Sequence, residues 1–121
     1  MFVDSPTLDQ RREAIALATP SGHKSALGQF MTPSVIARFM ASLFLPLAGK
    51  NIRLLDAGAG IGSLTAAFAE RAAQEGVGSL HLEAWEIDGT LHAPLADTLA
   101  ACSALLRERA SVCHSRIQSG D

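Results

Sequence analysis

An acidic residue followed by three closely spaced glycines is the feature of this sequence best suited to chemistry. Asp56 ends an apolar segment, and Gly58, Gly60 and Gly62 follow at intervals of two residues. Glycine has no Cβ, so the main chain can turn sharply there and approach a ligand closely. The segment after Gly62 has helical character, and the first N–H groups of a helix have no partner within it. The pattern is typical of a nucleotide-like ligand site between a strand and a helix.

The spacing of the glycines narrows the class of ligand. A dinucleotide fingerprint reads G-x-G-x-x-G, with a pyrophosphate at the helix N-terminus. Counted from Gly58, the last position of that pattern falls on Ser63, and the third glycine comes one residue early, at Gly62. The carboxylate of Asp56 would also repel a pyrophosphate. The spacing favours a ligand with a positive charge and no phosphate, the alternative being a tight strand–helix turn that binds nothing.

A second acidic residue follows the next apolar segment. Residues 80–88 are typical of a strand that ends in acid, and Glu86 lies 24 residues after Gly62. An acidic residue about 20 residues beyond a glycine loop often meets a ribose. A carboxylate can accept hydrogen bonds from both ribose hydroxyls. The alternative for Glu86 is an ordinary solvated strand end.

These segments, with one upstream block, resemble S-adenosylmethionine-dependent DNA adenine-N6 methyltransferases of restriction–modification systems. The upstream block is Gly28-Gln29-Phe30-Met31-Thr32-Pro33. Residues 56–62 resemble the cofactor loop of this family, and residues 84–88 resemble its ribose-binding strand end. Residues 117–121 give a weaker match. The resemblance covers roughly residues 22–121, and the upstream block is the part that indicates adenine-N6 methylation.

The resemblance implies S-adenosyl-L-methionine as the cofactor, no metal, and a defined set of cofactor-binding residues. Those residues are Thr32, Asp56, Gly58, Gly60, Gly62, Glu86, Ile87 and Asp121. Thr32, Asp56 and the glycines would contact the methionyl part and Glu86 the ribose. Ile87 would lie on the adenine face, and the Asp121 carboxylate would accept from the adenine amino group. None of these residues is expected to act as a general base or a nucleophile.

One departure from the family limits the expected activity. The family's catalytic signature, Asn/Asp-Pro-Pro-Tyr/Phe, does not occur in the 121 residues. The formal net charge is −2 with no basic cluster, whereas DNA binding needs a positive surface. We therefore expect the cofactor-binding portion of an enzyme, inactive alone, with double-stranded DNA bound by downstream regions. The alternatives are a methyltransferase acting on protein, RNA or a small molecule, or a non-catalytic remnant of the fold.

Composition favours a cytoplasmic protein. Hydrophobic residues make up 48% of the chain, and no segment reaches the roughly 20 apolar residues of a membrane span. The first residues lack the basic start of a secretory signal. Cys102 and Cys113 have no metal-ligand spacing and are expected to be reduced core thiols.

The order of elements predicts an α/β fold with parallel strands and crossover helices, preceded by N-terminal helices. The resemblance makes it a partial Rossmann-like class I methyltransferase fold, with residues 1–32 carrying a helix, a loop and the upstream motif. Residues 33–121 then form the N-terminal half of the cofactor domain. The expected elements are helix 5–18, loop 19–30, helix 33–45, strand 52–56, helix 63–74, strand 80–86, helix 90–109 and strand 111–118.

Three local expectations depend on this arrangement. Thr32 should cap the helix 33–45, with Pro33 at its first position. Trp85 should pack against a helix in the core. In the family fold the first strand lies between the second and the fourth, and no fourth strand occurs here. Residues 53–56 should therefore leave an unpaired sheet edge, through which chains can self-associate.

Overall fold

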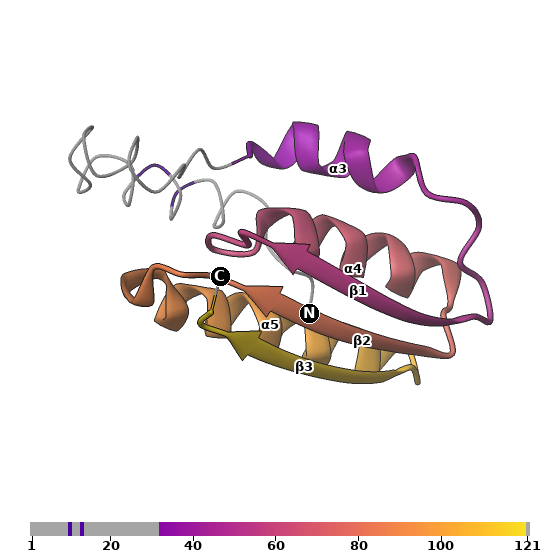
Figure 1. Cartoon of the computed structure of the whole chain (residues 1–121). Coiled ribbons are helices and arrows are strands. Elements are labelled where there is room, and N and C mark those ends of the chain that lie inside the picture. The colour runs from indigo at the N-terminus through magenta and orange to yellow at the C-terminus, as the bar shows by residue number, and fades with distance from the viewer. Residues whose placement is uncertain (1–9, 11–12, 14–31, 121) are drawn as a thin grey trace.

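The computed structural model describes residues 10, 13 and 32–120 (Figure 1). The expected helix 5–18, apart from residues 10 and 13, most of the upstream block and Asp121 lie outside the described residues. The elements are α3 (Ser34–Ser42), β1 (Asn51–Ala57), α4 (Ser63–Glu75), β2 (Ser79–Trp85), the 3-10 helix η1 (Gly89–Leu91), α5 (His92–Glu108) and β3 (Val112–Gln118). Every strand and helix expected after residue 32 is present, and the ends differ by a few residues.

The three strands form a parallel sheet in the order β1-β2-β3. Both crossover helices, α4 and α5, lie on the same side of this sheet, and α3 lies beside α4 (Figure 1). This arrangement confirms the expected α/β class and is consistent with part of a Rossmann-like fold. Because the strands are parallel, all their carboxyl ends meet at one edge, where the loops that carry Gly58 and Glu86 begin.

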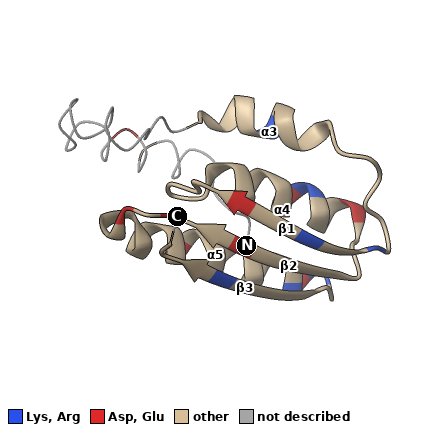
Figure 2. Ribbon diagram, in the orientation of Figure 1, with Lys and Arg blue, Asp and Glu red and all other residues tan. Residues whose placement is uncertain are grey.

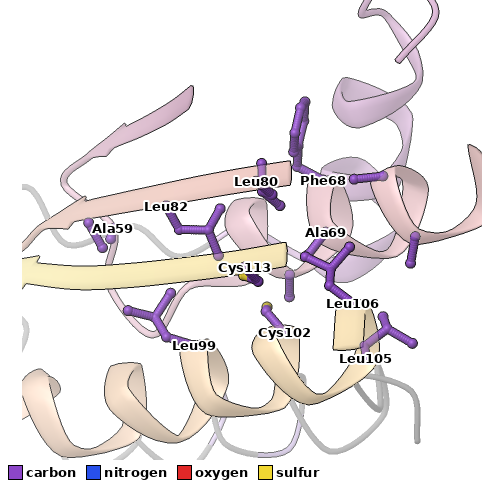
Figure 3. Packing of buried hydrophobic residues seen from close by; sticks show 14 of the residues in the cluster. Ala59, Phe68, Ala69, Leu80, Leu82, Leu99, Cys102, Leu105, Leu106 and Cys113 are labelled. Atoms are coloured by element: carbon purple, nitrogen blue, oxygen red, sulfur yellow. The ribbon is translucent and has the colours of Figure 1, made fainter. Parts of the chain in front are cut away.

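The core lies between one face of the sheet and the helices α4 and α5 (Figure 3). Alternate residues of β2, Leu80, Leu82 and Ala84, point into it and are buried. Burying one such leucine stabilises the fold by about 1.5–3 kcal/mol. Cys102 and Cys113 are free and buried in this core, which confirms their expected place.

The other face of the sheet is not covered by any described helix. We call this the bare face, and its residues are Arg53, Leu55, His81, Glu83, Trp85, His114 and Arg116, which line a hollow of about 610 Å³. The rings of His81 and His114 lie 4.9 Å apart across β2 and β3. Parallel sheets normally have both faces covered. Among the described residues, helices cover only one of the two faces.

Trp85 corrects an expectation from the sequence, because it lies on the bare face and not in the helix-covered core. It alternates with the buried residue Ala84, so its side chain points away from α4 and α5. The indole N–H donates to the carboxylate of Glu83, two residues earlier on the same face, at 2.8 Å. The strand was correctly predicted, but the core position of Trp85 was wrong.

The start of α3 also differs from the expectation. Pro33 is the N-cap residue, and no side chain caps the helix. The carbonyl of Pro33 accepts from the N–H of Ala37 at 3.0 Å, so Thr32 lies one residue outside the helix. The capping role predicted for Thr32 is therefore wrong.

The apolar face of α3 is exposed, whereas its small residues are buried. Ala37 and Ala41 pack against Ala67 of α4, since small side chains let the two helices approach closely. Arg71 of α4 donates to the carbonyl oxygens of Ala41 and Leu45 at 2.8 and 3.1 Å. The large apolar residues of α3 and of the turn after it stay exposed: Val35, Ile36, Phe39, Met40, Leu43 and Phe44. Of these, Phe44 also contacts the buried Phe68 of α4 edge-on, with ring centroids 5.0 Å apart.

Within the described residues, β1 pairs with β2 alone, so its other edge carries no strand partner. Leu55 on this strand is 63% exposed. A hollow of about 160 Å³ lies beside β1, and residues of α3 and α4 line its walls. None of the described helices is long and apolar enough to cross a bilayer.

Candidate functional site

The glycine loop lies at the carboxyl edge of the sheet, between β1 and α4. Gly58, Gly60 and Gly62 all have positive φ, at 73°, 60° and 86°. Other residues pay roughly 1–2 kcal/mol for this left-handed conformation. Three such positions within five residues give the loop a shape that a chain without these glycines could not hold easily.

The N–H groups of this loop donate to the end of β2. The N–H groups of Gly58 and Ala59 both donate to the carbonyl oxygen of Trp85, at 2.8 and 2.9 Å. The N–H of Gly60 donates to the Glu86 carboxylate at 2.8 Å. Three successive donors are thus used within the protein. A phosphate-binding loop directs such groups at its ligand, so this loop is poorly suited to a pyrophosphate.

Gly62 has a packing role in addition to its place in the loop. It is the N-cap residue of α4. A Cβ at this position would lie 2.9 Å from Cγ2 of Thr98 and 3.1 Å from Cδ1 of Leu95, both on α5. At Gly58, by contrast, a Cβ would meet nothing within 4 Å. The first glycine borders open space, and the third allows α4 to begin against α5.

Asp56 lies near the end of β1, on the side of the sheet that faces α4. Its Oδ2 accepts a hydrogen bond from the hydroxyl of Thr65, a buried residue of α4, at 2.6 Å. Burial raises the pKa of Asp56 above its ordinary value. The hydrogen bonds from Thr65 partly offset this rise, and the negative charge of Glu86 adds to it. An ionised Asp56 is therefore costly for the folded chain without a compensating positive charge.

Glu86 follows directly after β2 and is only 5% exposed. Its Oε1 accepts from the N–H of Gly60, and its Oε2 accepts from the N–H of Asp88, each at 2.8 Å. Its own N–H donates to the carbonyl oxygen of Gln118 at 2.9 Å. Nε2 of His92 lies 2.7 Å from the Glu86 carbonyl oxygen and therefore carries the proton of that bond. Glu86 is thus buried and hydrogen-bonded within the fold, unlike a solvated residue at a strand end.

Several residues that shape this edge were not predicted from the sequence. Oδ1 of Asp88 accepts from the N–H and the hydroxyl of Thr90, at 2.9 and 2.7 Å, and so caps η1. The Asp-x-Thr spacing before a helix could have predicted this cap. Thr65 and His92 carry no comparable sequence pattern, because their partners lie in other elements of the chain.

An open recess adjoins the glycine loop at the carboxyl edge. We call it the carboxyl-edge recess; it measures about 340 Å³ and is lined by Leu55, Ala57, Gly58, Trp85, Ile87 and Gly120. Ile87 is 53% exposed there. The structure thus brings Gly58 and Ile87 together at one recess, with Glu86 between β2 and Ile87. Thr32 lies just before α3, and the N-terminal end of α3 is on the same side of the molecule as the carboxyl ends of the strands (Figure 1). Asp121 lies outside the described residues.

The described part of the chain contains no group of three or more His, Cys, Asp or Glu residues that could hold a metal ion. What the site offers is two carboxylates, a glycine loop without spare donors in its first three residues, and an apolar recess. These features all lie at the carboxyl edge of one parallel α/β sheet.

Comparison with known proteins identifies the relatives of this chain. It is 53% identical over 78 residues to the type II methyltransferase M.BsuBI of Bacillus subtilis, a match that covers 64% of this chain and 16% of that protein. It is 39% identical over 95 residues to the type II methyltransferase M.PstI of Providencia stuartii, covering 78% of this chain and 18% of that protein. No family model and no solved structure matches the chain.

These similarities confirm the resemblance to methyltransferases of restriction–modification systems, because both relatives are type II methyltransferases. It spans less than a fifth of the length of the two relatives it matches.

The two outer glycines of the loop make a matched pair for testing the packing role of Gly62. Both Gly58→Ala and Gly62→Ala place a Cβ at positive φ. Only Gly62→Ala also forces that Cβ against Thr98, and overpacking costs about 1–3 kcal/mol. We expect urea unfolding to show Gly62→Ala less stable than Gly58→Ala by about this amount. Equal losses would contradict the packing role.

Asp56→Asn should stabilise the chain at neutral pH in the absence of ligand. Because folding raises the pKa of Asp56, its ionised form weakens the folded state once the pH rises through that raised value. Below an unfolded-state pKa of about 3.9, the carboxyl is protonated in both states, so the variant and the parent chain should then differ little. Urea unfolding across this pH range should show a difference that grows with pH. A difference in the free energy of unfolding between the two chains that does not change with pH would contradict this expectation.

Proposed function

We propose that this chain is the cofactor-binding portion of a DNA methyltransferase that transfers a methyl group from S-adenosylmethionine to adenine N6. The proposed cofactor-binding residues are Thr32, Asp56, Gly58, Gly60, Gly62, Glu86, Ile87 and Asp121. The observation that carries the proposal is the pair of carboxylates, Asp56 and Glu86, on either side of a glycine loop whose first N–H groups are already used. That combination favours a cationic nucleoside over a dinucleotide.

Asp56 supports a positively charged ligand. Its carboxylate is partly buried, with a raised pKa, so a cation placed nearby would supply the charge that the folded chain lacks. S-adenosylmethionine carries a sulfonium cation and supplies the methyl group when it is bound. The Thr65 hydroxyl keeps Asp56 oriented through its 2.6 Å hydrogen bond.

Glu86 can still accept from a ribose although both its oxygens are in use. Each carboxylate oxygen accepts one N–H here, and each has a second lone pair. Ribose hydroxyls would therefore share the carboxylate with Gly60 and Asp88. Beside it, the carboxyl-edge recess offers Ile87 and Leu55 as apolar surface, which suits the flat face of an adenine ring.

Adenine-N6 specificity rests on the resemblance of residues 28–33 to the upstream motif of that family. The DNA itself is proposed to bind through regions outside this chain. The described lysines and arginines are spread over separate helices and strands (Figure 2), and the formal net charge is −2, so the described residues offer no clustered basic surface for phosphates. We further propose that the chain is inactive by itself, because its 121 residues lack the Asn/Asp-Pro-Pro-Tyr/Phe signature, and that the enzyme is cytoplasmic. A methyltransferase acting on another substrate remains the alternative.

The proposal predicts binding of S-adenosylmethionine or S-adenosylhomocysteine and no binding of NAD. Isothermal calorimetry and thermal stabilisation of the purified chain should both show this preference. Asp56→Asn should weaken S-adenosylmethionine binding by about 1.5–3 kcal/mol, the usual loss for a hydrogen bond to a charged group. Glu83→Gln is the control, because Glu83 lies on the bare face of the same sheet. Stabilisation by NAD with none by S-adenosylhomocysteine would refute the proposal.

Self-association through the open edge of β1 is a second proposed property. The edge carries no strand partner among the described residues, and unpaired edges pair readily with other chains. We expect the chain to sediment as dimers or larger species at micromolar concentrations. Leu55→Lys should shift it toward the monomer, because a lysine on an edge strand opposes such pairing.

The control for this experiment is Leu45→Lys. Leu45 is the more exposed of the two leucines and lies in the segment between α3 and β1. Its substitution adds the same charge away from the strand. A parent chain that sediments as a monomer would contradict self-association. Equal dissociation by both substitutions would contradict the role of the β1 edge.

A further inference from the structure

The glycine loop and the turn after β2 are held together by one side chain. The loop follows β1 and the turn follows β2, so each leaves the sheet where the strand pairing ends. The Glu86 carboxylate bridges them by accepting from Gly60 on one side and Asp88 on the other, both at 2.8 Å. At 5% exposure, water cannot easily replace either bond.

Glu86 is itself fixed from three sides. Its N–H donates to the Gln118 carbonyl oxygen, which connects it to β3. Its carbonyl oxygen accepts from Nε2 of His92 at the start of α5. The residue before it, Trp85, receives two further loop N–H groups at its carbonyl oxygen. The end of β2 therefore acts as a rigid base against which the glycine loop is shaped.

We infer that Glu86 is a positioning residue that sets the glycine loop before any ligand arrives. It occupies the Gly60 N–H, which a phosphate-binding loop would direct at its ligand, and so acts as an internal anion. The inference rests on the proposed function only for the identity of the ligand that the loop would bind. The bonds themselves lie within the chain and exist without a ligand.

The chemistry of the two donors requires a carboxylate at this position. Both partners of the side chain are N–H groups, and an ionised carboxylate is acceptor-only. A glutamine of the same shape can offer its oxygen to only one of them. Its NH₂ group would then face the other N–H, leaving a buried donor without an acceptor. Glu86→Gln should therefore loosen the loop even when no cofactor is present.

The test is hydrogen exchange and thermal unfolding of the ligand-free chain. In Glu86→Gln the exchange rates of the Gly60 and Asp88 amides should rise by roughly tenfold or more. The unfolding midpoint should fall by roughly 4–8 °C, as expected for one such loss in a domain of this size. Glu83→Gln is the matched control: it makes the same change three residues earlier, and its oxygen can still accept from the Trp85 indole.

Equal exchange rates and midpoints in the two variants would overturn the inference. If Glu86→Gln does not fold, hydrogen exchange in the parent chain tests the inference instead. There the Gly60 and Asp88 amides should exchange at least about tenfold more slowly than unprotected amides, and unprotected rates would overturn the inference. A separate titration with S-adenosylmethionine keeps the two proposals distinguishable. Normal loop protection without cofactor binding would refute the proposed function alone.

Discussion

The carboxyl end of β2 determines the geometry of the whole candidate site. Its last carbonyl group, on Trp85, accepts from Gly58 and Ala59, and the next side chain, Glu86, accepts from Gly60. The backbone of β1 can therefore turn sharply at this point without leaving buried donors unpaired, which would otherwise cost about 1–3 kcal/mol each. These three bonds satisfy the first donors of the loop between β1 and α4.

The strands, the helices and the glycine turn were predictable because local patterns carry them. Alternation along residues 79–85 and the helical stretch after Gly62 are visible in the printed sequence. The errors came from contacts between elements. Thr32 has a typical capping side chain, yet the helix begins one residue later. Trp85 has a typical core side chain, yet α4 and α5 both lie on the opposite face of the sheet.

The candidate site was predictable in its residue types but not in its bonding. Asp56 and Glu86 are recognisable from their places at strand ends. That Thr65 binds the first carboxylate and that Gly60 and Asp88 share the second depends on distances across the fold. The similarity to type II methyltransferases is informative about the class of protein. What each acidic side chain bonds to is known only from the geometry of the fold.

The glycine that allows α4 and α5 to meet has an evolutionary consequence. A side chain at position 62 would collide with Thr98 and Leu95, so purifying selection for folding alone would retain Gly62. Gly58 borders open space, so within the fold only its positive φ limits which residue can replace it. Among descendants of this domain, the third glycine should therefore persist wherever α4 and α5 still pack together, whereas packing places no such demand on the first glycine.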